Sequence, residues 1–241
     1  MSVEQIVPGV LQVSLGIVNA FLLLGDDVTV IDTGVPGSAE KILSAVRETG
    51  KRPAHVRHIL LTHLHADHTG GAKALQEAVA ADGGQARIYM HRLDAEAFER
   101  GQVMRPVTPA PGLSNWLIVN LFMKRAGPMK IDPAKVDVSV SDGDALSMAG
   151  GLQVIHAPGH AAGQVVFLWP QQGGVLFAAD ACGRMGGRLG YPPIFEDFEL
   201  GKQTLRKLGG LAFENAVFGH GGPIRGGAAE QFRKKWTSLQ D

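Results

Sequence analysis

Short apolar runs alternate with amphipathic stretches along this chain, and glycine or aspartate separates many of them. The N-terminal runs VLQVSLG, IVNAFLLLG and DDVTVIDTG are rich in apolar and β-branched residues and are broken by glycine, which predicts strands. The run VRHILLTH (56–63) is typical of a buried strand, and ARIYMH (86–91) predicts another. Helical patterns fall between these runs, over roughly 39–49 and over AKALQEAVAA (72–81).

The second half of the chain repeats this theme with more strands. DALSMAGGLQVIHAPGH predicts a hairpin, QVVFLWP and GGVLFAAD predict paired strands, and NAVFGHGG predicts a further short strand. KQTLRKLGG is typical of the end of a helix, and AAEQFRKKWTSL is amphipathic and predicts a closing helix. Because helices and strands alternate, we predict an α/β layered fold in one domain spanning 1–241.

One segment, about 93–130, interrupts the pattern and resembles an inserted lid. AFERGQVMRPVTPAPGL is proline-rich and irregular, and SNWLIVNLFMKRAG is apolar on more than one face. Two interpretations of 113–125 stay open. The stretch is either an extra core helix or homodimer contact, or a lid that forms an apolar pocket for the acyl portion of a small-molecule substrate.

Composition narrows the functional classes. Lys plus Arg and Asp plus Glu are 23 each among 241 residues, and this balance argues against an electrostatic nucleic-acid binder. The single cysteine excludes an intrachain disulfide and fits a reducing compartment. The start MSVEQIVPGV lacks a signal-peptide pattern, and no apolar run is long enough to span a bilayer. We therefore expect a cytoplasmic protein without a membrane partner.

The stretch LTHLHADHTGG (61–71) carries the strongest chemical signal. It holds three of the nine histidines of the chain, together with an aspartate, within six residues. Crowded imidazoles repel one another when protonated and need hydrogen-bond partners when buried, so the usual reason for such a cluster is a metal ion. The cluster follows the carboxyl end of a predicted strand, where open α/β sheets build their sites.

Further candidate ligands stand at the ends of strands predicted in the second half of the chain. The full set is His63, His65, Asp67, His68, His160, Asp180 and His220. Zinc accepts imidazole and carboxylate ligands, and the absence of thiolates argues against a purely structural zinc site. Seven ligands are too many for one tetrahedral ion, but they suit two ions about 3.5–4 Å apart with a shared carboxylate.

Five short motifs resemble, in their order, those of the metallo-β-lactamase fold superfamily, and the resemblance covers nearly the whole chain. The motifs are IDTG (31–34), THLHADHTGG (62–71), APGH (157–160), AAD (178–180) and GHGG (219–222). The resemblance implies a four-layer αβ/βα sandwich, with the site along one edge between two sheets.

The resemblance also implies how the ligands are shared. One ion is expected on His63, His65 and His160, the other on Asp67, His68 and His220, with Asp180 bridging the two. Asp32 is expected to shape the loop beneath the metals. Two Zn²⁺ ions are the expected cofactors, with iron or manganese as alternatives.

The implied activity is that of a metal-dependent hydrolase of the glyoxalase II and lactonase branches, because true β-lactamases lack the carboxylate at Asp180. A hydroxide between the ions would attack the carbonyl carbon of a small thioester, lactone or ester, with Asp67 orienting this nucleophile and shuttling its proton. Gly183 departs from the lactonase pattern, which has tyrosine there, and Ala161 replaces a usual threonine.

Two other functions remain as alternatives. The same scaffold serves iron-dependent redox enzymes such as persulfide dioxygenases, which bind a single iron through three of these ligands. A non-catalytic scaffold that merely kept the fold is the other alternative, and the complete set of seven ligands argues against it.

Overall fold

Residues 2–140 build a seven-stranded mixed sheet in the order β1-β2-β3-β4-β5-β6-β8. The computed structural model describes residues 2–123 and 129–237. Pairing is antiparallel from β1 to β4 and parallel from β4 to β8. The strands are β1 (Ser2–Val7), β2 (Val10–Ser14), β3 (Asn19–Leu24), β4 (Val28–Ile31), β5 (Val56–Leu60), β6 (Arg87–His91) and β8 (Val138–Val140).

The second half builds a five-stranded sheet in the order β16-β12-β11-β10-β9. The predicted hairpin and the predicted strand pair are confirmed, because β9 pairs with β10 and β11 with β12, both antiparallel. Only β16 joins in parallel, beside β12. The strands are β9 (Ala145–Leu146), β10 (Leu152–His156), β11 (Val165–Trp169), β12 (Val175–Phe177) and β16 (Asn215–Val217).

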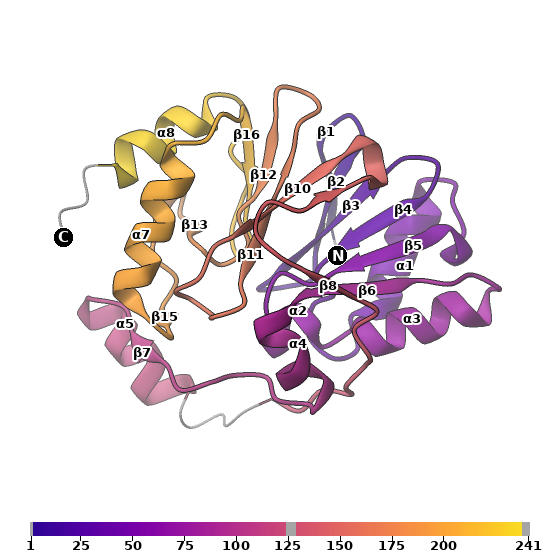
Figure 1. Cartoon of the computed structure of the whole chain (residues 1–241), viewed down its shortest axis with the longest axis horizontal. Helices are drawn as coiled ribbons and strands as arrows, with labels where there is room; N and C mark the ends of the chain where they lie inside the picture. Colours follow the sequence, from indigo (N-terminus) through magenta and orange to yellow (C-terminus); the bar gives the residue numbers. More distant parts are fainter. Residues whose placement is uncertain (1, 124–128, 238–241) are drawn as a thin grey trace.

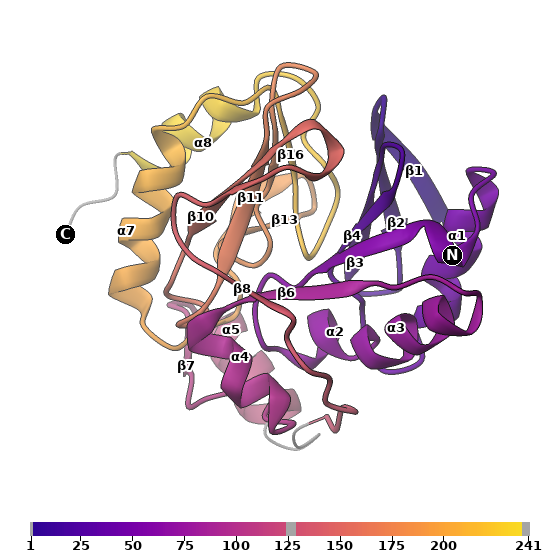
Figure 2. The same ribbon diagram turned by 45° about the vertical axis from the view of Figure 1, so that its right-hand side comes forward.

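Helices cover the outer face of each sheet, which gives the four layers seen in Figure 1 and, after a turn of the view, in Figure 2. The first sheet carries α1 (Ala39–Glu48), α3 (Ala72–Ala81) and α4 (Arg92–Glu99), and the second carries α7 (Phe198–Gly209) and α8 (Ala228–Trp236). The expected αβ/βα sandwich is therefore confirmed. None of the helices described is long and apolar enough to cross a membrane.

Three apolar clusters hold these layers together. Ile42 of α1 packs in the first, between the helices and the seven-stranded sheet, and Phe232 of α8 packs in the third, under the outer helices of the other sheet. The middle cluster lies between the sheets, where the rings of Phe21 and Phe177 meet edge to face at 5.5 Å. Each fully buried side chain of this kind contributes about 1.5–3 kcal/mol. The two sheets are thus fixed against each other.

The segment over 93–130 differs from its prediction in two respects. Its start is regular, since α4 is a helix whose Phe98 is fully buried. Further on come α5 (Leu113–Leu117) and a π-helical turn (Ile118–Met123). Among the apolar side chains described there, those in solvent are Leu113, Trp116, Leu117, Ile118 and Leu121. Leu113 is 74% exposed and Trp116 is 52% exposed, so the interpretation of this stretch as an extra core helix is wrong. Residues 124 and 125 of the predicted stretch lie outside the described residues.

Short elements connect these layers around the edge of the sandwich. They are a 3₁₀ turn (Pro53–His55), α2 (Ala66–Thr69), β7 (Thr108–Pro109), a second 3₁₀ turn (Met148–Gly150), β13 (Gly183–Met185), β14 (Arg188–Gly190) and β15 (Ile194–Phe195). Two of them tie the exposed segment to the second half of the chain, because β7 pairs antiparallel with β15.

Candidate metal centre

The histidine-rich loop leaves the end of β5 and turns directly into α2. The turn packs tightly on the loop after β4, where Thr33 donates to the carbonyl oxygen of His68 through both its amide and its hydroxyl. A side chain at Gly71 would place its Cβ 2.4 Å from the carbonyl oxygen of Thr33. The glycines that follow the histidines therefore allow the two loops to approach each other.

Three histidines from the two halves of the chain converge on one point, and we call them the three-histidine group: His63, His65 and His160. Nε2 of His63 lies 3.1 Å from Nδ1 of His65, and Nε2 of His160 lies 2.9 Å from the same atom. All three side chains are buried. Ring nitrogens around one tetrahedral zinc ion are about 3.3 Å apart at ordinary Zn–N lengths, so the spacing fits a shared ion.

A second group lies beside the first and consists of Asp67, His68 and His220. Nε2 of His220 lies 3.3 Å from Oδ2 of Asp67, and Nε2 of His68 lies 3.8 Å from the same oxygen. This set can also place one donor atom of each member around a single cation. It is less enclosed than the three-histidine group, because Asp67 is 28% exposed.

Asp180 stands between the two groups. Its Oδ2 lies 3.6 Å from Nε2 of His160 and 3.2 Å from Nε2 of His220, while its Oδ1 lies 3.5 Å from Nε2 of His68. One carboxylate therefore faces ligands of both groups. All seven residues singled out from the sequence are brought together.

Partners outside the cluster set which nitrogen of each ring is free to bind a metal. Nδ1 of His160 donates to the carbonyl oxygen of Ile194 at 2.9 Å, and Nδ1 of His220 donates to that of Ile17 at 2.6 Å. Nδ1 of His68 donates to the carboxylate of Asp32 at 2.8 Å. In each ring Nε2 is therefore the nitrogen that faces the cluster and would bind a metal once it carries no proton.

Asp32 and Thr62 fix the ring of His63 in the same way. The Thr62 hydroxyl donates to Asp32, with distances of 3.0 and 2.9 Å to the two carboxylate oxygens. Its oxygen is then free to accept from Nδ1 of His63 at 3.0 Å. Asp32 itself has a backbone φ of 58°, which for a residue other than glycine is rare outside turns and functional loops. Sequence reasoning missed Thr62, although it stands next to the first histidine of the loop.

The three-histidine group is electrostatically neutral near pH 7. Burial lowers the pKa of His65 to about 3, and it also lowers the pKa of His63 and of His160. The neighbouring imidazoles act in the same direction on His63 because like charges repel. Neutral imidazole is the form that binds a cation.

The second group has the opposite electrostatics. The charge of Asp180 is the main cause that raises the pKa of His220 to about 10. Burial opposes the protonation of His68, but the carboxylates of Asp180, Asp32 and Asp67 outweigh it and hold the pKa of His68 well above its ordinary value. Burial likewise acts against ionised Asp67 and Asp180, yet His68 and His220 keep the pKa of both carboxyl groups below its usual range.

Several buried polar atoms at the centre lack a partner within the described part of the chain. They are Nε2 of His65, Nε2 of His68 and Oδ1 of Asp180. Buried polar atoms normally have a hydrogen-bond partner, and leaving one without a partner costs about 1–3 kcal/mol. Two of these atoms, on His68 and Asp180, face each other across 3.5 Å. A divalent cation bound here would satisfy both, so the residues fit a metal.

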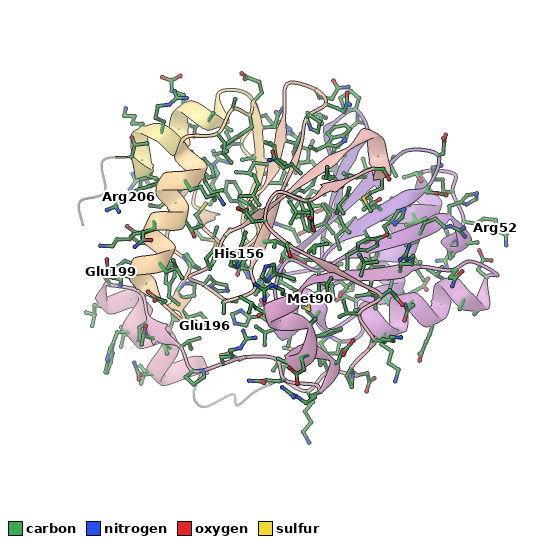
Figure 3. The ribbon with its side chains drawn as sticks, in the orientation of Figure 1. Arg52, Met90, His156, Glu196, Glu199 and Arg206 are labelled. Atoms are coloured by element: carbon green, nitrogen blue, oxygen red, sulfur yellow. The ribbon has the colours of Figure 1, made fainter. Side chains whose placement is uncertain are left out.

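Two other histidines lie outside this centre. The rings of His91 and His156 stack on each other at 4.3 Å, and Nε2 of His156 is 2.8 Å from the carbonyl oxygen of Ala162. His156 is labelled in Figure 3. Their contacts are with each other and with backbone, so they support the loop after β10 and do not enlarge the ligand set.

The model of the metallo-β-lactamase superfamily matches residues 13–220 of the chain. The chain belongs to the metallo-β-lactamase superfamily. This superfamily consists mostly of hydrolytic enzymes, and the centre described above supplies the metal-binding side chains that such enzymes use. The family assignment agrees with the resemblance drawn from the five motifs.

Individual members of the superfamily are similar over most of the domain. A protein of Bacillus subtilis called uncharacterized protein YobT is 30% identical over 174 residues, which are 70% of this chain and 64% of that protein. A hydroxyacylglutathione hydrolase of Anaeromyxobacter dehalogenans is 35% identical over 161 residues, 58% of this chain and 59% of that enzyme. The chain thus spans less than two thirds of the length of each.

Among solved structures, the metallo-β-lactamase GOB-18 of Elizabethkingia meningoseptica superposes with a TM-score of 0.71 at 17% identity. The superposition covers 99% of this chain and 89% of that one. At this identity the likeness establishes the four-layer fold alone.

Proposed function

We propose that this superfamily member is a dinuclear zinc hydrolase that cleaves a small thioester, lactone or ester. The observation that carries the proposal is the position of Asp180 between the three-histidine group and the second group, within 3.6 Å of His160 and 3.2 Å of His220. Two adjacent sets of nitrogen and oxygen donors that share one carboxylate suit a pair of divalent cations. The similarity to a hydroxyacylglutathione hydrolase also supports an acyl compound as substrate.

The protein side of the mechanism follows from burial and charge. When bound, two zinc ions supply Lewis acidity and lower the pKa of bound water toward neutrality. Asp67 is the carboxylate of the centre that reaches solvent, with 28% of its side chain exposed, whereas Asp32 and Asp180 are buried. Since His68 and His220 keep Asp67 ionised, its carboxylate can accept a hydrogen bond from the attacking water and take up its proton.

The substrate is proposed to carry an apolar portion that lies against α5. A cavity of about 660 Å³ is lined by Pro109, Ala110, Pro111, Gly112, Leu113 and Trp116. This stretch is tied to the centre, because β7 pairs with β15 and the carbonyl oxygen of Ile194 in β15 accepts from His160. We call this cavity lining the apolar wall. An apolar surface beside a polar reaction centre suits an acyl or alkyl chain.

Metal content and hydrolysis together test the proposal. We expect protein purified without added metal to hold about two zinc ions per chain, measured by inductively coupled plasma mass spectrometry, and to cleave members of a thioester, lactone and ester panel. Asp67→Ala should lose this activity while remaining folded. About one iron per chain, with oxygen consumption in the presence of persulfides, would overturn the hydrolase in favour of an iron-dependent oxygenase.

A further inference from the structure

A fully buried carboxylate on α4, outside the seven ligands, holds both histidine-bearing loops of the three-histidine group. Oδ2 of Asp94 accepts from the amide of Leu64, which stands between His63 and His65, at 3.1 Å. Oδ1 of Asp94 accepts from the amide of Gly163 at 3.1 Å. Gly163 lies on the loop that carries the third histidine, so one side chain connects ligand loops from the two halves of the chain.

A second carboxylate, Glu196, holds the loop of His160 from the other side. Oε2 of Glu196 accepts from the amide of Ala162 at 2.9 Å, and the amide of Glu196 donates to the carbonyl oxygen of His160 at 3.3 Å. Glu196 lies between β15 and the start of α7, and it is labelled in Figure 3. The loop after His160 is therefore bonded to two acidic side chains that are remote from each other in sequence.

Arg105 joins the two carboxylates. Its Nη1 donates to Oδ1 of Asp94 at 2.7 Å and lies 3.3 Å from Oε1 of Glu196, and its Nη2 donates to the carbonyl oxygen of Leu93. Three acceptors from two directions fix the plane of the guanidinium group. We call Asp94, Arg105 and Glu196 the clamp.

The residues around the clamp leave the side chain of Asp94 little room to move. A Cβ at Gly163 would lie 2.4 Å from Cγ of Asp94, so only glycine leaves room for this carboxylate. Burial raises the pKa of Asp94, and the hydrogen bond and charge of Arg105 act against this shift. Buried ion pairs are weak sources of net stability, because packed apolar residues often do as well. A network of directional hydrogen bonds is better suited than an apolar core to fixing the positions of the two ligand loops.

We propose that Asp94, Arg105 and Glu196 position the three-histidine group for its metal ion, an inference that rests on the metal centre of the proposed function. The ring nitrogens of His63 and His65 come from the first half of the chain and that of His160 from the second. Sites of this kind need their ligands held within about 0.5 Å of the binding geometry. The clamp bonds the backbone on both sides of that junction.

Competitive zinc titration of Arg105→Met against a chromophoric chelator tests the clamp without any substrate. We expect one of the two zinc affinities to fall by about 10- to 100-fold, the usual effect of losing a partner behind the ligands, and the other to change by less than about threefold. Arg100→Met is the matched control. It removes the same charge near the end of α4, where Arg100 pairs with exposed Glu96, and it should leave both affinities unchanged.

Combining Arg105→Met with a second substitution identifies which of the two metal sites is affected. In His65→Ala, which lacks a member of the three-histidine group, Arg105→Met should have no further effect on the zinc affinity that remains. Arg105→Lys keeps the charge but not the forked donors, so it should bind zinc more weakly than wild type and more tightly than Arg105→Met. Equal weakening of both affinities, or no weakening in protein that is folded by circular dichroism, would overturn the clamp.

Glu196→Gln covers the case in which Arg105→Met does not fold. It keeps an oxygen acceptor for Ala162 and removes the charge that faces Arg105, and weakening of the same single zinc affinity supports the clamp. An unchanged affinity in this variant overturns it. Failure of the proposed function is recognised separately, since wild-type protein would then hold fewer than two zinc ions or would bind two and hydrolyse nothing in the panel.

Discussion

Nδ1 of His68 donates to Oδ2 of Asp32 at 2.8 Å, and both side chains are almost completely buried. The other donors to this carboxylate are the amide and the hydroxyl of Thr62. Asp32 thus orients His68 directly and His63 through Thr62. One aspartate outside the ligand set controls a ring in each metal group, so it is a sensitive position for substitution.

Asp32→Asn should therefore weaken both zinc affinities while leaving the fold in place. An amide offers one oxygen, so whichever way it is turned its NH₂ group meets a donor, either on Thr62 or on His68. We expect a loss of about 1–3 kcal/mol in unfolding free energy for the unsatisfied donor. We also expect a fall of about 10- to 100-fold in zinc affinity. Urea unfolding of metal-free protein and chelator competition measure the two effects.

Asp26→Asn provides the control for this substitution, because it removes the charge of an exposed aspartate in the turn before β4. It should change neither quantity. A fully active Asp32→Asn protein with wild-type zinc affinities would show that His68 and His63 are oriented by other contacts.

Gly219→Ala should displace the side chains of Asp180 and His68. A Cβ at this position would lie 2.1 Å from Oδ1 of Asp180 and 2.7 Å from Cε1 of His68. We expect the added methyl group to push Asp180 away from its position between the two groups. The zinc affinity of the second group (Asp67, His68 and His220) should then fall by at least about tenfold. Metal content after dialysis against a weak chelator measures this loss. Gly190→Ala, with open space around the added Cβ, is the control and should retain both ions.

Local pattern predicted most regular elements because it records which face of each element is buried. The helix predicted over 72–81 matches α3 (Ala72–Ala81), and that over 39–49 matches α1 to within one residue. The seven candidate ligands were found because each stands in a short motif at the end of a strand. The five motifs also stand in the order that the resemblance to the superfamily requires, and the superfamily match agrees with this resemblance.

The clamp could not be found in this way. Arg105 and Glu196 are 91 residues apart, and Asp94 and Gly163 are 69 apart, so the chain must fold before either pair meets. The sequence pattern also does not predict the helix that carries Asp94, because the proline-rich stretch after it favours an irregular segment. Its apolar positions, Ala95 and Phe98, are the signal that could have identified it.

The apolar wall predicts a preference for longer acyl chains. Each methylene transferred from water to an apolar surface contributes about 0.8 kcal/mol, so kcat/KM for esters should rise with chain length until the wall is covered. The double variant Leu113→Ser, Trp116→Ser should flatten this rise and leave short-chain turnover within about twofold of wild type. A homologous series of acyl thioesters or p-nitrophenyl esters provides the measurement.

Met185→Ser is the control for the apolar wall, since it removes an apolar side chain that is 69% exposed and lies on the β13–β14 hairpin, not on α5. It should keep the full dependence on chain length. If the double variant loses short-chain and long-chain turnover equally, the segment does not contact the acyl chain and the pocket interpretation fails.

The opposite electrostatics of the two metal groups predict different proton release on zinc binding. In metal-free protein near pH 7, His220, with a pKa of about 10, and His68, with a pKa well above its ordinary value, carry protons on Nε2, while the three-histidine group is already neutral. Zinc at the second group must displace about two protons, and zinc at the three-histidine group close to none. The Nδ1 protons of His68 and His220 stay in place, because Asp32 and the carbonyl oxygen of Ile17 accept them.

The sign of the pH dependence follows from these shifts. A raised folded-state pKa stabilises the metal-free protein below the ordinary value of 6.5, and this contribution is lost as pH rises through about 10 for His220. Over the same range zinc competes with fewer protons, so its affinity for the second group should rise by close to two powers of ten per pH unit near neutrality. Isothermal titration in two buffers of different ionisation enthalpy resolves the proton count of each step. Equal release at both steps would contradict the assignment of charge to the second group.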